Sequence, residues 1–290
     1  MIPVVDDSIA EVQRRVAGAV RAMVVGRRRR HAALVEAGAD DPGLFGPDSA
    51  AWRVHRDAAM FVGGLRALLL QTLHPLAMAG VADHSDYRTD PWGRLHRTAD
   101  FIGTTTYGTT DVAMRSIARV RTIHERVRGT APDGRPYSAT DPRLIAWVHV
   151  TEVDSFLRAN QRYGADRLDR RDADRYVAEM SVVADLLGSE PVPTTVAELR
   201  QWLDDIRPEL TAGRQARDAV RFLLLPPVAL VARGPYSLIA AASVGLLPGW
   251  ARRHLWLPNP PLVDPILVQP SARFLLASLG WALRADDRSA

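Results

Sequence analysis

Apolar residues recur every three or four positions along most of the chain, which is the spacing of helices that bury one face. No stretch alternates strictly between apolar and polar residues within turn-forming boundaries, so no β-strand is predicted. The pattern therefore predicts an all-α protein that forms a single globular domain of many helices.

Capping and helix-breaking residues divide this pattern into elements. The predicted helices span residues 8–35, 49–75, 94–105, 110–128, 142–163, 172–187, 196–206 and 212–225. The second of these is apolar on nearly every side, with Arg66 as its one interruption between residues 58 and 70, so we expect it at the centre of the molecule. We expect an N-terminal helical extension over residues 1–44, the main domain over 45–260 and a helical tail on the same domain over 261–290.

The most apolar part of the chain covers residues 222–250. Its four prolines cut it into pieces shorter than the ~20 residues that a membrane-spanning helix needs. One interpretation is a helical hairpin that closes over the core. The other is an apolar roof over a pocket, or a surface that makes peripheral contact with a membrane or an apolar substrate.

The composition excludes several reaction classes. The 290 residues contain no cysteine, and all 37 residues counted as lysine or arginine are arginine. Schiff-base chemistry, thiol nucleophiles, disulfides and cysteine-bound metals are therefore excluded. The net charge is +4, but the one dense basic run, residues 27–30, has no interleaved aromatic residues, so no nucleic-acid partner is expected. The chain starts without the pattern of a secretion signal, and we expect it to be cytoplasmic.

The predicted helix over residues 110–128 carries the first candidate site. At about 100° per residue, His124 lies in the middle of the apolar stripe of this helix, and Arg121 and Arg128 lie on the same stripe. Two inward guanidinium groups need anionic partners. These are either carboxylates of the protein or the propionates of a haem whose iron a histidine binds; the candidate carboxylates are Glu152, Asp154 and Glu179.

Other polar side chains lie on apolar faces. Arg94 and Thr98 share a face of their helix with Phe101, where they could line a pocket and donate hydrogen bonds to a bound oxygen. His74 ends the central helix, and His149 lies on the apolar face of the helix over residues 142–163. The alternative for each histidine is a hydrogen-bonded structural role.

Five stretches in order resemble the mpaB / rubber oxygenase (latex clearing protein) family. They read Ala67-Leu-Leu-Leu-Gln-Thr-Leu-His-Pro75, Gly80-Val-Ala-Asp-His-Ser85, Gly93-Arg-Leu-His-Arg-Thr98, Arg121-Thr-Ile-His-Glu-Arg-Val-Arg128 and Trp147-Val-His149. The resemblance covers about residues 45–260, and it implies an all-α fold that holds a b-type haem.

The resemblance also implies roles for individual residues. His124 matches the proximal iron ligand, Arg121 and Arg128 lie close to the haem, and His149 falls among the cofactor-binding residues. Arg94 and Thr98 match the family motif on the haem side of the pocket. The glutamate that polyisoprene-cleaving members use as a base has no match in residues 76–79, which leaves His74 as the candidate base.

These roles together imply a haem-b-dependent oxygenase that uses O₂ or peroxide. Its partner would be an apolar small molecule, such as an unsaturated isoprenoid or a lipid-like compound. A haem peroxidase and a non-catalytic haem carrier or sensor remain as alternatives with the same ligands. A third reading is a helical protein that uses its apolar segment only to dock on a membrane or another protein.

Overall fold

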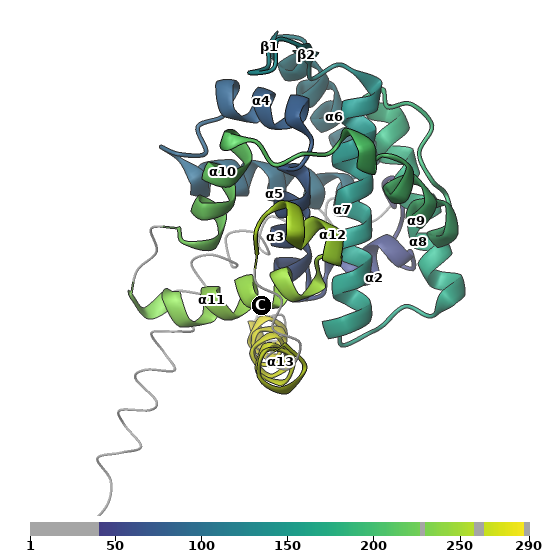
Figure 1. The fold of residues 1–290 in the computed structure, drawn as a ribbon. Helices are drawn as coiled ribbons and strands as arrows, with labels where there is room; N and C mark the ends of the chain where they lie inside the picture. The colour runs from purple at the N-terminus through teal and green to yellow at the C-terminus, as the bar shows by residue number, and fades with distance from the viewer. Residues whose placement is uncertain (1–40, 227–229, 258–263, 287–290) are drawn as a thin grey trace, which may run out of the picture.

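The computed structural model describes residues 41–226, 230–257 and 264–286, and within them it confirms an all-α fold (Figure 1). The expected helix over residues 8–35 lies outside this part. The α-helices are α2 Ala50–His55, α3 Met60–Gln71, α4 Pro75–His84, α5 Pro91–Tyr107, α6 Thr110–His124, α7 Pro142–Tyr163, α8 Arg170–Leu187, α9 Val196–Asp205, α10 Arg214–Leu224, α11 Leu230–Leu246, α12 Gly249–His254 and α13 Gln269–Asp286. Shorter elements are the 3₁₀ turn Arg207–Glu209, the π turn Asp264–Val268, and the strands β1 Arg128–Thr130 and β2 Pro136–Ser138.

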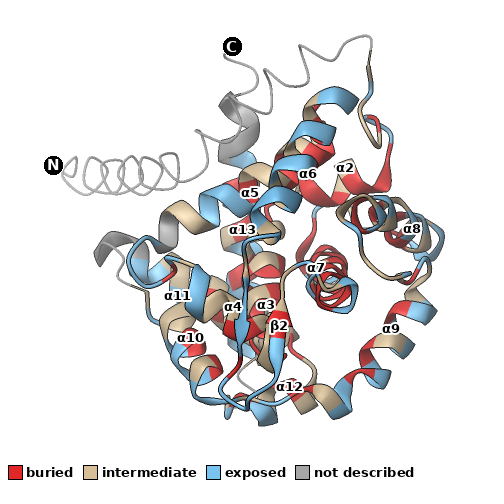
Figure 2. Ribbon diagram, turned by 90° about the horizontal axis from the view of Figure 1, so that it is seen from above, coloured by how far each residue is buried: buried red, intermediate tan, exposed pale blue. Residues whose placement is uncertain are grey.

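Helices α3 and α7 form the centre of the molecule, and Figure 2 shows that α7 is buried on most of its surface. The two helices approach closely at Gly63, where a Cβ atom would lie 2.7 Å from Cδ1 of Phe156 and 3.1 Å from its backbone. Glycine is therefore required at this crossing. The bounds of α7 match the prediction, because Asp141 caps its first turn, Pro142 occupies the first helical position and Gly164 follows its last residue.

The predicted long helix over residues 49–75 is wrong in its continuity. It is divided into α2 and α3, and the chain turns at residues 56–59. The side chain of Asp57 accepts a hydrogen bond from the Ala59 amide at 2.8 Å and another from the Ala165 amide at 2.8 Å. A short acidic side chain that satisfies local amides in this way competes with helical hydrogen bonding. A further helix, α4, begins at Pro75, where the sequence predicted the end of a helix and no new element.

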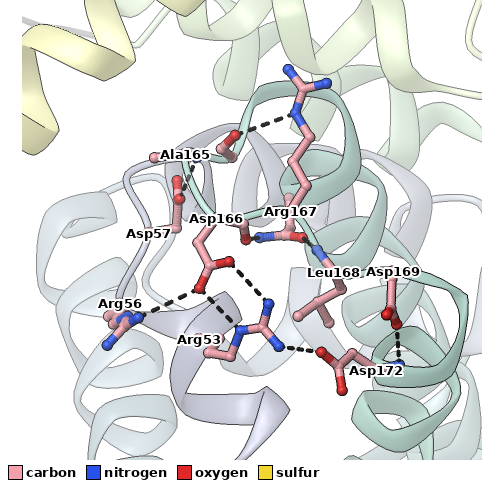
Figure 3. A network of polar contacts seen from close by, with 11 residues as sticks. Arg53, Arg56, Asp57, Ala165, Asp166, Arg167, Leu168, Asp169 and Asp172 are labelled. Carbon is pink, nitrogen blue, oxygen red and sulfur yellow. Dashed lines mark hydrogen bonds and ion pairs between the residues drawn. The ribbon is translucent and has the colours of Figure 1, made fainter.

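Arg53 joins α2 to the segment between α7 and α8, as Figure 3 shows. Its guanidinium donates to the two carboxylate oxygens of Asp166 at 2.9 and 3.0 Å and to Asp172 as well. The two acidic partners raise the pKa of Arg53 above its usual range. These contacts hold α2 against the segment that precedes α8 and against the first turn of α8.

The predicted helix over residues 110–128 is wrong at its C-terminal end. Helix α6 ends at His124, and Arg128 instead begins β1, which pairs antiparallel with β2. The Ala139 amide donates to the Val127 carbonyl at 2.8 Å, and Arg128 is the register partner of Ser138. The hairpin therefore competes for backbone groups that a longer helix would have used. The sequence predicted no β-strand, and this small two-stranded sheet corrects that prediction.

The end of the molecule opposite the hairpin is formed by α11 and α13 (Figure 1). Helix α11 packs on α3, and the Ser243 hydroxyl donates to the Val62 carbonyl at 3.0 Å. No single helix of the described residues is long and apolar enough to cross a membrane. Helices α3 and α4 pass that test of length and composition only as a pair, and they are bent by 104° to each other.

Candidate functional site

Helices α5 and α6 pack against each other and carry most of the candidate residues. Asp90 caps α5 by accepting a hydrogen bond from the Gly93 amide at 2.8 Å, and Thr109 caps α6 through the Val112 amide. Only Gly108 and Thr109 separate the two helices. Because His124 is the last residue of α6, its side chain is placed by the helix and not by a loop.

The imidazole of His124 is partly buried and incompletely satisfied. Its Nδ1 atom is inaccessible to solvent, and no hydrogen-bond partner for it exists among the described residues. Burial lowers the pKa of His124 from its usual value, which favours the neutral ring. A neutral imidazole with an unused buried nitrogen can bind a metal or accept a hydrogen bond.

Arg94 is the second incompletely satisfied side chain. It lies in the first turns of α5, and no carboxylate or hydrogen-bond acceptor contacts its guanidinium within the part of the chain that the structure describes. Burial lowers its pKa, and the nearby Tyr87 partly offsets this effect. A partly buried guanidinium without an anion can be stabilised by a carboxylate-bearing ligand. Thr98, by contrast, is exposed, so it does not share a buried surface with Arg94.

The prediction that Arg121 and Arg128 point inward is wrong. Both residues are exposed. Arg121 donates from Nη1 to the Leu186 carbonyl at 3.3 Å, at the C-terminal end of α8. Arg128 lies beyond the end of α6, so the helical periodicity that placed it on the stripe of His124 does not apply to it. Whether either side chain contacts a cofactor stays a prediction.

The carboxylates named as alternative partners for Arg121 and Arg128 are engaged elsewhere or face other groups. Asp154 forms ion pairs with Arg66 at 2.8 Å and with Arg158 at 2.8 Å. Glu179 pairs with Arg175 at 2.7 Å. The protein network that could have replaced an anionic ligand at Arg121 and Arg128 is therefore not formed.

His149 and Glu152 lie one turn apart on α7, and neither forms a hydrogen bond or ion pair with another described residue. Burial lowers the pKa of His149 to about 4 and raises that of Glu152 to about 7. Both side chains are therefore mostly neutral near pH 6. Glu152 also helps to raise the pKa of Tyr176, which places these two groups near each other.

Two further buried histidines are satisfied by the protein. His74 accepts a hydrogen bond from the Ala77 amide at 3.5 Å as the cap of α4, and its Nε2 lies 4.0 Å from Glu209. Burial lowers its pKa, so the ring is neutral enough to act as that acceptor. His55, which the sequence did not single out, contacts Thr106 at 2.7 Å and Tyr176 at 3.1 Å. The structural alternative therefore accounts for the contacts of His74, and its role as a base stays a prediction.

Sequence reasoning missed Glu152 as a site residue in its own right. Its signal was available, because His149, Glu152 and Phe156 recur at helical spacing on the apolar face of α7. The spacing could not predict that the Glu152 carboxyl group lacks a hydrogen-bond partner among the described residues, because its neighbours come from other helices. Among the described residues, no three or more histidine, aspartate or glutamate side chains lie together in a way that could hold a metal ion.

Comparison with known families places this geometry in context. Residues 52–285 match the family model described as ER-bound oxygenase mpaB/B'/Rubber oxygenase, catalytic domain. No curated protein and no solved structure matches the chain. The match covers most of the chain and agrees with the resemblance of its sequence motifs. The protein therefore belongs to the mpaB/rubber oxygenase family of oxygenase catalytic domains.

Proposed function

We propose that this protein is a haem-b-dependent oxygenase, with His124 as the protein ligand to the iron. The observation that carries the proposal is the buried Nδ1 atom of His124, which has no partner among the described residues. Burial also lowers the pKa of this imidazole, which favours the neutral ring that a ligand to iron requires. When bound, the haem would supply the activation of oxygen, and the protein would supply ligation, polarity and exclusion of water.

Arg94 supports the same proposal through its charge. Its guanidinium is partly buried and lacks an acceptor among the described residues, so it suits a carboxylate of the haem or a bound oxygen atom. Thr98 and the exposed Arg121 and Arg128 would contribute only where the bound ligand reaches them.

The substrate we propose is an apolar, unsaturated molecule of the isoprenoid or lipid type. His149 and Glu152 on α7 suit an apolar substrate, since both side chains are mostly neutral near pH 6. Glu152 can hold or release a proton at its carboxyl group close to neutral pH, whereas the deeply neutral His149 can only accept one at acid pH. Glu152 is therefore a better candidate than His74 for moving a proton.

The experiment that tests haem binding is reconstitution of the purified protein with haemin. We expect a Soret band in the wild type and its loss in His124→Ala, with unchanged helical content by circular dichroism. His96→Ala is the matched control, because His96 is an exposed histidine of α5 and should not affect the spectrum. A protein that stays colourless with added haemin, or a His124→Ala variant with the wild-type spectrum, would contradict the proposal.

Oxygenase activity requires a separate measurement. Consumption of O₂ with an unsaturated isoprenoid, followed by mass spectrometry of the products, distinguishes an oxygenase from a haem carrier. Arg94→Ala should retain a Soret band but lower this turnover. A wild-type protein that binds haem without consuming O₂ or peroxide would favour the carrier, and unchanged turnover in Arg94→Ala would remove Arg94 from the reaction.

A further inference from the structure

Helix α13 is apolar on two opposite faces. Its inner face packs against α11 and α7 through Ala272, Leu276 and Leu279. Its outer face carries Pro270, Phe274, Ala277 and Trp281, and Leu267 of the π turn continues this row just before the helix; all five are exposed, and we call them the outer stripe. The spacing of three and four residues keeps the outer stripe in one row. A surface helix needs only one apolar face to pack on its own domain, so no packing among the described residues explains the outer stripe.

The exposed apolar area is concentrated here. Of the eleven large apolar side chains exposed in the described residues, four lie between residues 266 and 281. Phe274 is 78% exposed, Trp281 69% and Leu267 61%. Residues 222–250, where the sequence predicted peripheral membrane contact, include one such side chain in their described part, Leu225. Among the described side chains, exposed apolar surface is therefore concentrated at residues 266–281, in the π turn and α13.

Positive charge lies along one edge of the outer stripe. Arg273 is exposed and donates to the Arg162 carbonyl at 3.5 Å, and Arg162 in turn binds Gln269 at 3.2 Å. Asp264 lies beside them, since it accepts a hydrogen bond from the Gln269 side chain at 2.9 Å. Among the described side chains, this edge therefore has two cations for one anion, which complements an anionic surface.

We propose that the outer stripe of α13 docks the protein on the surface of a lipid bilayer that contains anionic headgroups. Phenylalanine, tryptophan and leucine beside arginine are the residues of helices that lie in the membrane interface. The stripe is about 21 Å long, and at the width of one helix it offers on the order of 200 Å². A stable dimer needs about 800 Å² from each partner, so a second copy of the chain is a poor occupant, whereas one such stripe suffices for an interfacial helix.

The test is co-sedimentation with vesicles of phosphatidylcholine, with and without phosphatidylglycerol. We expect the wild type to bind the vesicles that contain phosphatidylglycerol, with weaker binding at high salt. The double variant Phe274→Ser and Trp281→Ser should bind at least tenfold more weakly, because two large side chains no longer enter the interface. Since both are exposed, the helical content should not change.

A matched pair of single variants distinguishes the effect of a charge within the outer stripe from the effect of the same change in total charge elsewhere on the helix. Ala277→Glu places a carboxylate in the outer stripe, and Ser271→Glu places one on an exposed side of the same helix beyond the stripe. We expect the first to abolish binding and the second to retain most of it. Equal effects of the two, or a wild type that remains in the supernatant with both lipids, would overturn the proposal.

Light scattering in solution completes the test. A wild type that forms dimers, which the double variant converts to monomers, would assign the stripe to a second copy and overturn the membrane proposal. None of these measurements requires haem, so membrane docking can fail while haem binding stands, and the reverse.

Discussion

Buried polar side chains in this protein differ in whether neighbouring residues satisfy them. Arg66 is 1% exposed, yet it is fully engaged, with Asp154 at 2.8 Å, the Ser155 hydroxyl and the Leu246 carbonyl at 2.9 Å. His124 is only partly buried, but its Nδ1 atom is withdrawn from solvent and has no partner among the described residues, and the partly buried Arg94 has no acceptor among them either. This contrast separates structural groups from groups that a ligand would complete.

The ion pair of Arg66 and Asp154 gives a prediction at the scale of residues. Asp154→Ala leaves a buried guanidinium without its anion and should lower the free energy of unfolding by roughly 3–5 kcal/mol. Asp111→Ala, which removes an exposed pair with Arg115, should cost less than about 1 kcal/mol. Urea unfolding followed by circular dichroism measures both. Similar losses in the two variants would show that Arg66 does not depend on Asp154.

Helix α7 shows how one element can hold two ionisable groups in a mostly neutral state. The pKa of His149 is lowered to about 4 and that of Glu152 is raised to about 7, both by burial. The charged form of His149 destabilises the fold as the pH falls, and the charged form of Glu152 does so as the pH rises. Burial of this face of α7 therefore costs least between about pH 4 and pH 7, where both side chains are mostly neutral.

Glu152 gives the prediction for this element. Its pKa rises on folding from an ordinary value of 4.5, so its favourable contribution is complete below about pH 4.5 and is lost as the pH rises through about 7. The wild type should lose up to roughly 3 kcal/mol of unfolding free energy between these limits through this group. Urea unfolding at mildly acidic and mildly alkaline pH should show a smaller difference in Glu152→Gln.

Glu125→Gln serves as the control for that measurement, because Glu125 is an exposed glutamate at the end of α6. It should retain the pH dependence of the wild type. If Glu152→Gln keeps that dependence as well, another group is responsible for it, and the proton-holding role that we propose for Glu152 loses its support.

For the whole molecule, the proposed cofactor should act as a stabilising ligand. A ligand that binds only the folded state raises the free energy of unfolding by about 2.7 kcal/mol at a hundredfold excess over its dissociation constant. We therefore expect added haemin to raise the melting temperature of the wild type and of His96→Ala, and to leave that of His124→Ala unchanged. An equal rise in all three proteins would indicate nonspecific haem binding.

The sequence by itself determined the helical class, the bounds of α7 and the presence of a candidate histidine at position 124. These features depend on local periodicity, on caps such as Asp141 and on helix-compatible residues such as Pro142, which act within a few positions. The composition likewise limited any metal ligand to residues other than cysteine. The motifs that resemble the oxygenase family are also properties of short stretches, so they could be recognised without a structure.

Only the tertiary structure decided where α6 ends and which arginines are buried. The helix stops because a hairpin pairs Arg128 with Ser138, and that pairing involves residues ten positions apart with a turn between them. Helical periodicity extended past this point predicts Arg128 on the apolar stripe with His124, whereas Arg128 is exposed. Likewise, Arg66 meets Asp154 only because α3 and α7 cross, and the outer stripe of α13 is visible only once its inner face is packed. Contacts between distant segments depend on the packing of whole elements, which local sequence patterns do not specify.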